Sequence, residues 1–204
     1  MSNNLYPIFL KAHQLDILII GGGSVGLEKL SFMLKSSPYA RVTLVGKTIR
    51  SEIRQLATRH PQITLLEREY FTEDLTGMHL VLVATENPET NRKIQQEAKD
   101  RGILVNVADT PELCDFYLGS IVTKGHLKVA ISTNGQSPTI AKRLREVLDD
   151  ALPEEIDELL LRMKQIRNQL KGNFGYKVKE LNRLTSSLVY GTKHKENENE
   201  RDNS

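Results

Sequence analysis

Residues 15–26 read LDILIIGGGSVG, an apolar run that passes directly into the glycine pattern G-x-G-x-x-G. The apolar run is typical of a buried strand, and residues 25–35 show the apolar spacing of a helix. Glycine permits the tight turn between them and lets the backbone approach a pyrophosphate without a Cβ in the way. The free N–H groups that begin the helix would point at the phosphates. We therefore expect a dinucleotide-binding loop formed by Gly21, Gly22, Gly23, Ser24 and Val25, with a purely structural glycine turn as the alternative.

Alternating strand and helix patterns continue beyond this loop to residue 107. Further strands are expected at 41–45, 63–66, 80–85 and 103–107, and further helices at 51–59 and 88–101. Asn87 and Pro88 are expected to open the last of these helices, as its N-cap and its first residue. Five strands with intervening helices predict an α/β fold with a Rossmann-like, doubly wound parallel sheet.

The pattern changes near residue 110. Short strands at 120–123 and 127–132 predict an antiparallel hairpin, and a helix follows the polar loop 133–138. Beyond residue 152 an amphipathic stripe predicts a mostly helical segment. We therefore expect a dinucleotide-binding domain over 1–112, a small α+β region over 113–150, a helical C-terminal segment over 151–191 and a disordered polar tail over 192–204.

The composition excludes several classes of function. A formal net charge of +2 over 204 residues provides no strong field for nucleic acid. No apolar run approaches the roughly 20 residues that span a bilayer, and the N-terminus lacks a signal-peptide pattern, so we expect a cytoplasmic protein without membrane contact. The single cysteine, Cys114, excludes an internal disulfide, and we interpret it as a small buried apolar residue. The histidines are scattered, so no resident metal site is expected.

Polar residues follow the expected strands at the edge of the sheet where a dinucleotide lies. The candidates for cofactor binding there are Lys47, Thr48, Thr85, Asn87 and Asn106. The acid that usually binds the adenosine ribose, about 20 residues beyond the glycines, is absent from residues 45–48. Lys47 alone suggests the 2′-phosphate of NADP, whereas ribose contacts from the backbone and Thr48 would leave Lys47 in solvent. The strand end leaves both interpretations open.

Asp109 follows the last of the parallel strands. A carboxylate at this strand end would lie near the nicotinamide, where it could accept a proton from a bound substrate. An unperturbed aspartate is a weak base with a pKa of about 3.9, so we expect partial burial to raise its pKa. The alternative is a turn-forming aspartate ahead of Pro111, and spacing alone does not separate the two.

Four segments, in this order, resemble the precorrin-2 dehydrogenase family, which comprises the dehydrogenase module of sirohaem synthase and its free-standing relatives. They are the opening 5–10, the glycine loop and helix 21–29, the stretch 106–111 with Phe116 and 120–122, and the stretch 129–138 with Ala141 and 144–145. Gly26 stands where the family usually has alanine. The likeness covers residues 5–150. The glycine loop alone is common to many families, and it is the combination of the four segments that is specific to this one.

The resemblance implies an NAD-dependent oxidation of the tetrapyrrole precorrin-2 to sirohydrochlorin, with iron insertion as a second activity of some relatives. It implies that Asp109 is the catalytic aspartate and that NAD contacts Ser24, Val25, Lys47 and Thr48. It also implies a homodimer joined through the region after residue 112, with the substrate between the dinucleotide domain and that region. Substrate contacts are expected from Ser132, Thr133, Asn134, Gly135, Ser137 and Lys142.

Cations gather around the loop 133–138, at Lys124, Lys128, Lys142, Arg143 and Arg145. They either solvate a helix face or form a rim that receives a polyanionic substrate, and the sequence leaves both open. A different class of function also stays open, namely a non-catalytic regulatory module that senses a nucleotide. Such a module needs the glycine loop but has no use for Asp109 or for the loop 132–138.

Overall fold

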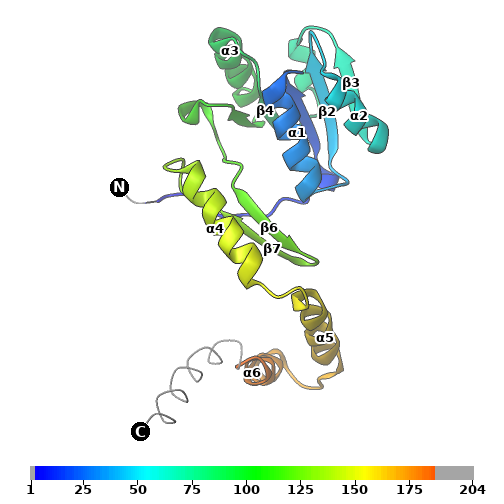
Figure 1. Ribbon diagram of the computed structural model, residues 1–204, viewed down its shortest axis with the longest axis vertical. Helices are drawn as coiled ribbons and strands as arrows, with labels where there is room; N and C mark the ends of the chain where they lie inside the picture. The colour runs from blue at the N-terminus through cyan, green and yellow to red at the C-terminus, as the bar shows by residue number, and fades with distance from the viewer. Residues whose placement is uncertain (1–2, 187–204) are drawn as a thin grey trace. The chain divides into compact units, whose positions relative to one another are not determined.

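The computed structural model describes residues 3–186, which form two compact units (Figure 1). The first unit contains residues 3–121 and 130–147, and the second contains residues 122–129 and 148–186 of the described chain. The polar tail expected over 192–204 lies outside the described residues. None of the helices within residues 3–186 has both the length and the apolar composition that a membrane crossing requires.

The first unit is built on a five-stranded parallel sheet with the order β3-β2-β1-β4-β5. Its strands are β1 (Asp16–Ile20), β2 (Arg41–Gly46), β3 (Ile63–Glu67), β4 (Leu80–Val83) and β5 (Leu104–Val107). The strand order reverses between β1 and β4, which is the switch point where a doubly wound sheet binds its ligand. The predicted Rossmann-like α/β sheet is confirmed.

Helices cover both faces of this sheet (Figure 1). They are α1 (Ser24–Ser36), α2 (Ser51–Arg59) and α3 (Pro88–Lys99). Side chains alternate along β1, so Ile17 and Ile19 pack in one buried cluster with α1 and α2. Leu18 and Ile20 point the other way and pack in a second cluster with α3. The continuous apolar run of β1 is explained by this burial on both sides.

The start of α3 confirms the predicted capping. The side-chain oxygen of Asn87 accepts hydrogen bonds from the backbone N–H groups of Glu89 and Thr90, at 2.9 and 3.0 Å. Pro88 takes the first helical position, where its missing N–H costs nothing. These residues fix the sharp turn from β4 into α3.

Three short 3-10 helices lie in the connections of the first unit: η1 (Ala12–Gln14), η2 (Thr72–Leu75) and η3 (Pro111–Leu113). After η3 the chain runs beside β5, where the backbone N–H of Asp115 donates to the carbonyl oxygen of Val105 at 2.8 Å. Cys114 packs against the cluster on the α3 side, whereas Phe116 and Leu118 pack against the cluster on the α1 side. The segment 114–118 therefore crosses from one face of the sheet to the other.

The hairpin and the helix predicted after residue 119 are also present. The strands β6 (Ser120–Lys124) and β7 (Leu127–Ile131) form a two-stranded sheet, and α4 (Pro138–Ala151) follows the polar loop. The connection between the strands is two residues long, which allows only antiparallel pairing. Gly125 in this turn has a φ of +54°, the left-handed region that favours glycine.

The second unit ties the hairpin turn to the helical segment. Its helices are α5 (Ile156–Gln169) and α6 (Phe174–Leu184). The Asp157 carboxylate accepts a hydrogen bond of 2.5 Å from the backbone N–H of His126 and lies 2.7 Å from Nδ1 of the same residue. These bonds hold the pKa of Asp157 below its usual range. Lys124 pairs with Glu154 and lies 3.9 Å from Asp149, so its charge is neutralised within this unit.

Candidate active site

The glycine loop packs so tightly that side chains are excluded at its first and second positions. Gly21 has a φ of +124°, and a Cβ there would come under 3.0 Å from the carbonyl oxygen of Ala84. A Cβ on Gly22 would approach the carbonyl oxygen of Thr48 as closely, and one on Gly26 would meet that of Gly21. In contrast, a Cβ on Gly23 would meet nothing within 4 Å. The loop is therefore pressed against the ends of β2 and β4 while Gly23 faces open space.

Helix α1 begins at this open side without a side-chain cap. Gly23 is the N-cap residue, and the first helical bond runs from the N–H of Leu27 to its carbonyl oxygen at 3.0 Å. The preceding N–H groups of the first turn have no side chain bonded to them. A pyrophosphate fits this cradle, since the backbone can approach it and the amide groups can bind it.

The end of β2 shows why the usual acidic residue is absent. Gly46 occupies that position, and a Cβ there would lie 2.7 Å from the backbone nitrogen of Gly22. Lys47, the next residue, forms an ion pair of 2.8 Å with Glu69. This pair holds the pKa of the Glu69 carboxyl below its usual range. The charge of Lys47 is thus already matched by an acid that follows β3.

The end of β4 uses its polar side chains locally. The Thr85 hydroxyl donates to Oδ1 of Asn91 at 2.5 Å, and Nδ2 of Asn91 donates back to the carbonyl oxygen of Thr85 at 3.1 Å. The oxygen of Asn87 is occupied by the N-terminus of α3. Both predicted cofactor residues therefore stand at the expected strand end, but their side chains shape the turn, and cofactor contact from them stays a prediction.

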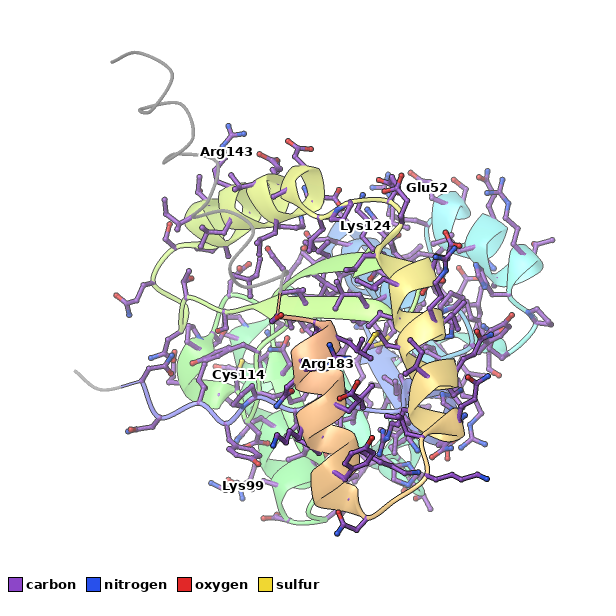
Figure 2. The ribbon with its side chains drawn as sticks, turned by 90° about the horizontal axis from the view of Figure 1, so that it is seen from below. Glu52, Lys99, Cys114, Lys124, Arg143 and Arg183 are labelled. Atoms are coloured by element: carbon purple, nitrogen blue, oxygen red, sulfur yellow. The ribbon has the colours of Figure 1, made fainter. Side chains whose placement is uncertain are left out.

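The end of β5 is held by buried polar contacts. Asn106 is 6% exposed, and its Nδ2 donates to the carbonyl oxygen of Phe116 at 2.9 Å. The Cys114 sulfur accepts a bond of 3.2 Å from the N–H of Val107 and lies 3.3 Å from the carbonyl oxygen of Thr110. Burial raises the pKa of the Cys114 thiol, as suits an unreactive cysteine (labelled in Figure 2). Its partners are polar, however, so it is not the plain apolar residue that the sequence suggested.

Asp109 lies on the loop that closes around this sulfur. Its φ is +54°, a conformation that aspartate tolerates better than most residues. The residue is exposed, so the partial burial expected from the sequence is not found in the single chain. The side chain is therefore presented at the strand end rather than enclosed there.

The loop 132–138 has a fixed shape of its own. Asn134 and Gly135 have φ values of +53° and +75°, which suits the Asn-Gly dipeptide. The Thr133 hydroxyl accepts a hydrogen bond from the N–H of Ser137 and donates to its carbonyl oxygen, both at 3.1 Å. The hydroxyl of Ser137 in turn accepts from the N–H of Ile140 at 3.2 Å and caps α4. The conformation of the predicted substrate loop is thus supported by hydrogen bonds within the loop.

A cleft of about 290 Å³ in the first unit brings several of these residues together. The predicted site residues that line it are Asn106, Asp109, Ser132, Thr133 and Gly135. Asn134, Ser137 and Lys142 are not among its lining residues, and Lys142 is exposed on α4. Four further polar residues line the cleft without having been predicted as site residues: Lys29, Thr110, Tyr117 and Ser120. Among residues 3–186 no cluster of His, Cys, Asp and Glu is arranged to hold a metal ion.

Comparison with known proteins agrees with this geometry. Residues 8–120 match a family model described as "Putative NAD(P)-binding", and residues 124–151 match one described as "Sirohaem biosynthesis protein central". The chain belongs to the family described by the first of these models, the putative NAD(P)-binding family. The family resemblance seen in the sequence is confirmed, and the matched residues 8–120 include the glycine loop.

Relatives of this family member include two enzymes named siroheme synthase. The one from Vesicomyosocius okutanii is 33% identical over 84% of this chain and 36% of its own length. The one from Pseudoalteromonas translucida is 36% identical over 82% of this chain and 35% of its own length. The chain thus spans about a third of the length of these relatives. The solved structure of SirC, a precorrin-2 dehydrogenase, matches with a TM-score of 0.71 at 24% identity, over 88% of this chain and 89% of SirC, and shows the same fold.

Proposed function

We propose that this chain oxidises precorrin-2 to sirohydrochlorin with NAD as the hydride acceptor. The observation that carries the proposal is the cleft in the first unit. It is lined by Asp109, by the loop residues Ser132 and Thr133, and by α1, the helix that follows the glycine loop. The family and the name siroheme synthase of its relatives support the same reaction class. A nucleotide sensor would have no need for an acid in such a cleft.

The chain's contribution to this reaction is binding and proton transfer. Gly21, Gly22 and Gly23, with the first N–H groups of α1, would hold the pyrophosphate. When bound, NAD supplies the hydride acceptor. In the same oxidation the substrate loses a proton, which the Asp109 carboxylate accepts and then releases to water. The exposure of Asp109 favours that release.

NAD rather than NADP is supported by the end of β2. A 2′-phosphate needs an available cation, and Lys47 is already paired with Glu69 at 2.8 Å. Lys47 is therefore less available to a 2′-phosphate than an unpaired lysine would be.

A homodimer joined through α4 is part of the proposal. Ile140, Leu144 and Val147 lie on α4 at helical spacing and are 54%, 45% and 61% exposed. Such an apolar stripe is costly in water and is typical of a protein–protein contact. A second copy of this chain is the partner that the family resemblance suggests. A cytoplasmic location stays a prediction.

The test is an assay with purified chain, precorrin-2 and NAD, followed through the absorbance of NADH and of sirohydrochlorin. Production of both, faster with NAD than with NADP, is the expected result. Binding of NAD without any oxidation would favour the regulatory module instead. A parallel reaction with ferrous ion and sirohydrochlorin tests iron insertion separately.

A further inference from the structure

Only two of the side chains that line the cleft carry a charge, the Asp109 carboxylate and the Lys29 ammonium. Lys29 is partly exposed, and within residues 3–186 it forms no ion pair with an acid. The cleft therefore offers one cation to a ligand, and this cation lines the same cleft as Asp109.

The cations that the sequence suggested as a rim are placed differently. Arg143 forms an ion pair of 2.7 Å with Glu146, and Arg145 lies 3.6 Å from the same acid. The Arg143 side chain (labelled in Figure 2) is exposed on α4. The two arginines thus share one carboxylate on the helix itself, an arrangement typical of a solvated helix face. Neither lines the cleft.

Lys29 is held in position by the packing of α1. Leu30, the next residue, is fully buried at 0% exposure, and Leu34 one turn later is 5% exposed. Lys29 and Cys114 both line the cleft, and the loop that carries Asp109 is closed around the sulfur of that cysteine.

We propose that Lys29 is a substrate-binding residue that forms an ion pair with a carboxylate of the tetrapyrrole, an inference that rests on the proposed function. The substrate carries many carboxylates, and Asp109 must be ionised to accept a proton. The Asp109 carboxylate and the carboxylates of the substrate would repel each other in this cleft. The ammonium group of Lys29, which lines the same cleft, offsets that repulsion. Lys29 therefore orients the macrocycle toward Asp109 while adding no contact to the pyrophosphate.

The experiment compares Lys29→Met with Lys35→Met, which removes the same charge from an exposed position on the same helix. Titration with sirohydrochlorin alone gives a Kd that needs neither turnover nor NAD. For K29M we expect this Kd and the KM for precorrin-2 to rise about tenfold, the usual cost of a lost charged hydrogen bond. The Kd for NAD stays unchanged, Lys29→Arg restores most of the binding, and K35M behaves as the unmodified protein.

Two outcomes would overturn the inference: K29M binding sirohydrochlorin as tightly as K35M, or K29M losing NAD affinity to the same extent. A Lys29→Gln variant is measured in the same way, and its circular dichroism spectrum is compared with that of the unmodified protein. It shows whether weak binding by K29M results from a folding defect that methionine causes. If the unmodified protein neither binds sirohydrochlorin nor oxidises precorrin-2, the proposed function itself fails, and that result is distinct from either of the two.

Discussion

The backbone N–H of Val107 donates to the sulfur of Cys114 across 3.2 Å at the point where β5 ends. Val107 is 2% exposed, so no water replaces this partner readily. The same sulfur faces the carbonyl oxygen of Thr110, so both flanks of Asp109 are fixed to one atom. The position of the proposed catalytic aspartate thus depends on a cysteine that carries out no chemistry itself.

Replacing this cysteine should therefore affect both stability and turnover. We expect Cys114→Ala to lower the free energy of unfolding by about 1–2 kcal/mol, because a buried N–H loses its acceptor. The kcat should fall while the Kd for NAD stays unchanged. Urea unfolding and steady-state kinetics measure the two effects. Cys114→Ser keeps a hydrogen-bond donor and an acceptor, so its stability and kcat should lie between those of C114A and the unmodified protein. Full activity and stability in C114A would refute the role given to the sulfur.

The proposed role of Asp109 as proton acceptor is best tested by substituting asparagine for it. Asn tolerates the left-handed φ of +54° as Asp does, so Asp109→Asn removes the charge without new backbone strain. We expect kcat to fall about 10²-fold or more, since the proton acceptor is lost. NAD affinity and oligomeric state should not change. Near-normal turnover of precorrin-2 by D109N would remove Asp109 from the mechanism.

The glycine loop offers two substitutions with opposite effects on stability. Gly23→Ser places a good N-capping hydroxyl where a side chain has room, so Tm should stay equal or rise. NAD binding should weaken about tenfold, because the hydroxyl competes with the pyrophosphate for the same N–H groups. Gly22→Ala should instead lower Tm, since its Cβ meets the carbonyl oxygen of Thr48. Calorimetry with and without NAD separates the two, and unchanged NAD affinity in G23S would argue against the cradle.

The acid sensitivity of the fold should depend partly on Asp74. Hydrogen bonds from Arg68, at 2.6 and 2.8 Å, hold the pKa of this carboxyl below its usual value, and its side chain is only 8% exposed. Because the pKa of Asp74 is lower in the folded than in the unfolded protein, its ionised form stabilises the fold at pH values above its pKa in the unfolded chain. This stability is lost as the pH falls through its pKa in the folded protein. Asp74→Asn should thus lose about 1–2 kcal/mol near neutral pH and little under strongly acidic conditions. Urea unfolding across that range checks it, and an equal loss at every pH would contradict it.

The sequence predicted the sheet because buried parallel strands leave continuous apolar runs, such as residues 17–20, between recognisable turns. It also predicted Asp109 and the loop 132–135, through the resemblance to a family. It could not identify Lys29, because helical spacing says which face of α1 a residue occupies but not which distant loop crosses that face. Nor could it tell that the oxygen of Asn87, named both as a cap and as a cofactor contact, is used by the cap. Such competition between local and distant partners is settled only by three-dimensional packing.

The apolar stripe on α4 leads to a test of the proposed homodimer. Leu144→Asp places a charge in the middle of the exposed residues Ile140 and Val147, where a contact between two copies would bury it at high cost. We expect light scattering to report half the mass of the unmodified protein. Thr139→Asp adds the same charge at an exposed position of the same helix and should leave the dimer intact. Because both residues lie on α4 and neither belongs to the glycine loop or to the ends of β2, β4 and β5, both variants should bind NAD normally. A dimer that persists in L144D would place the contact elsewhere on the chain.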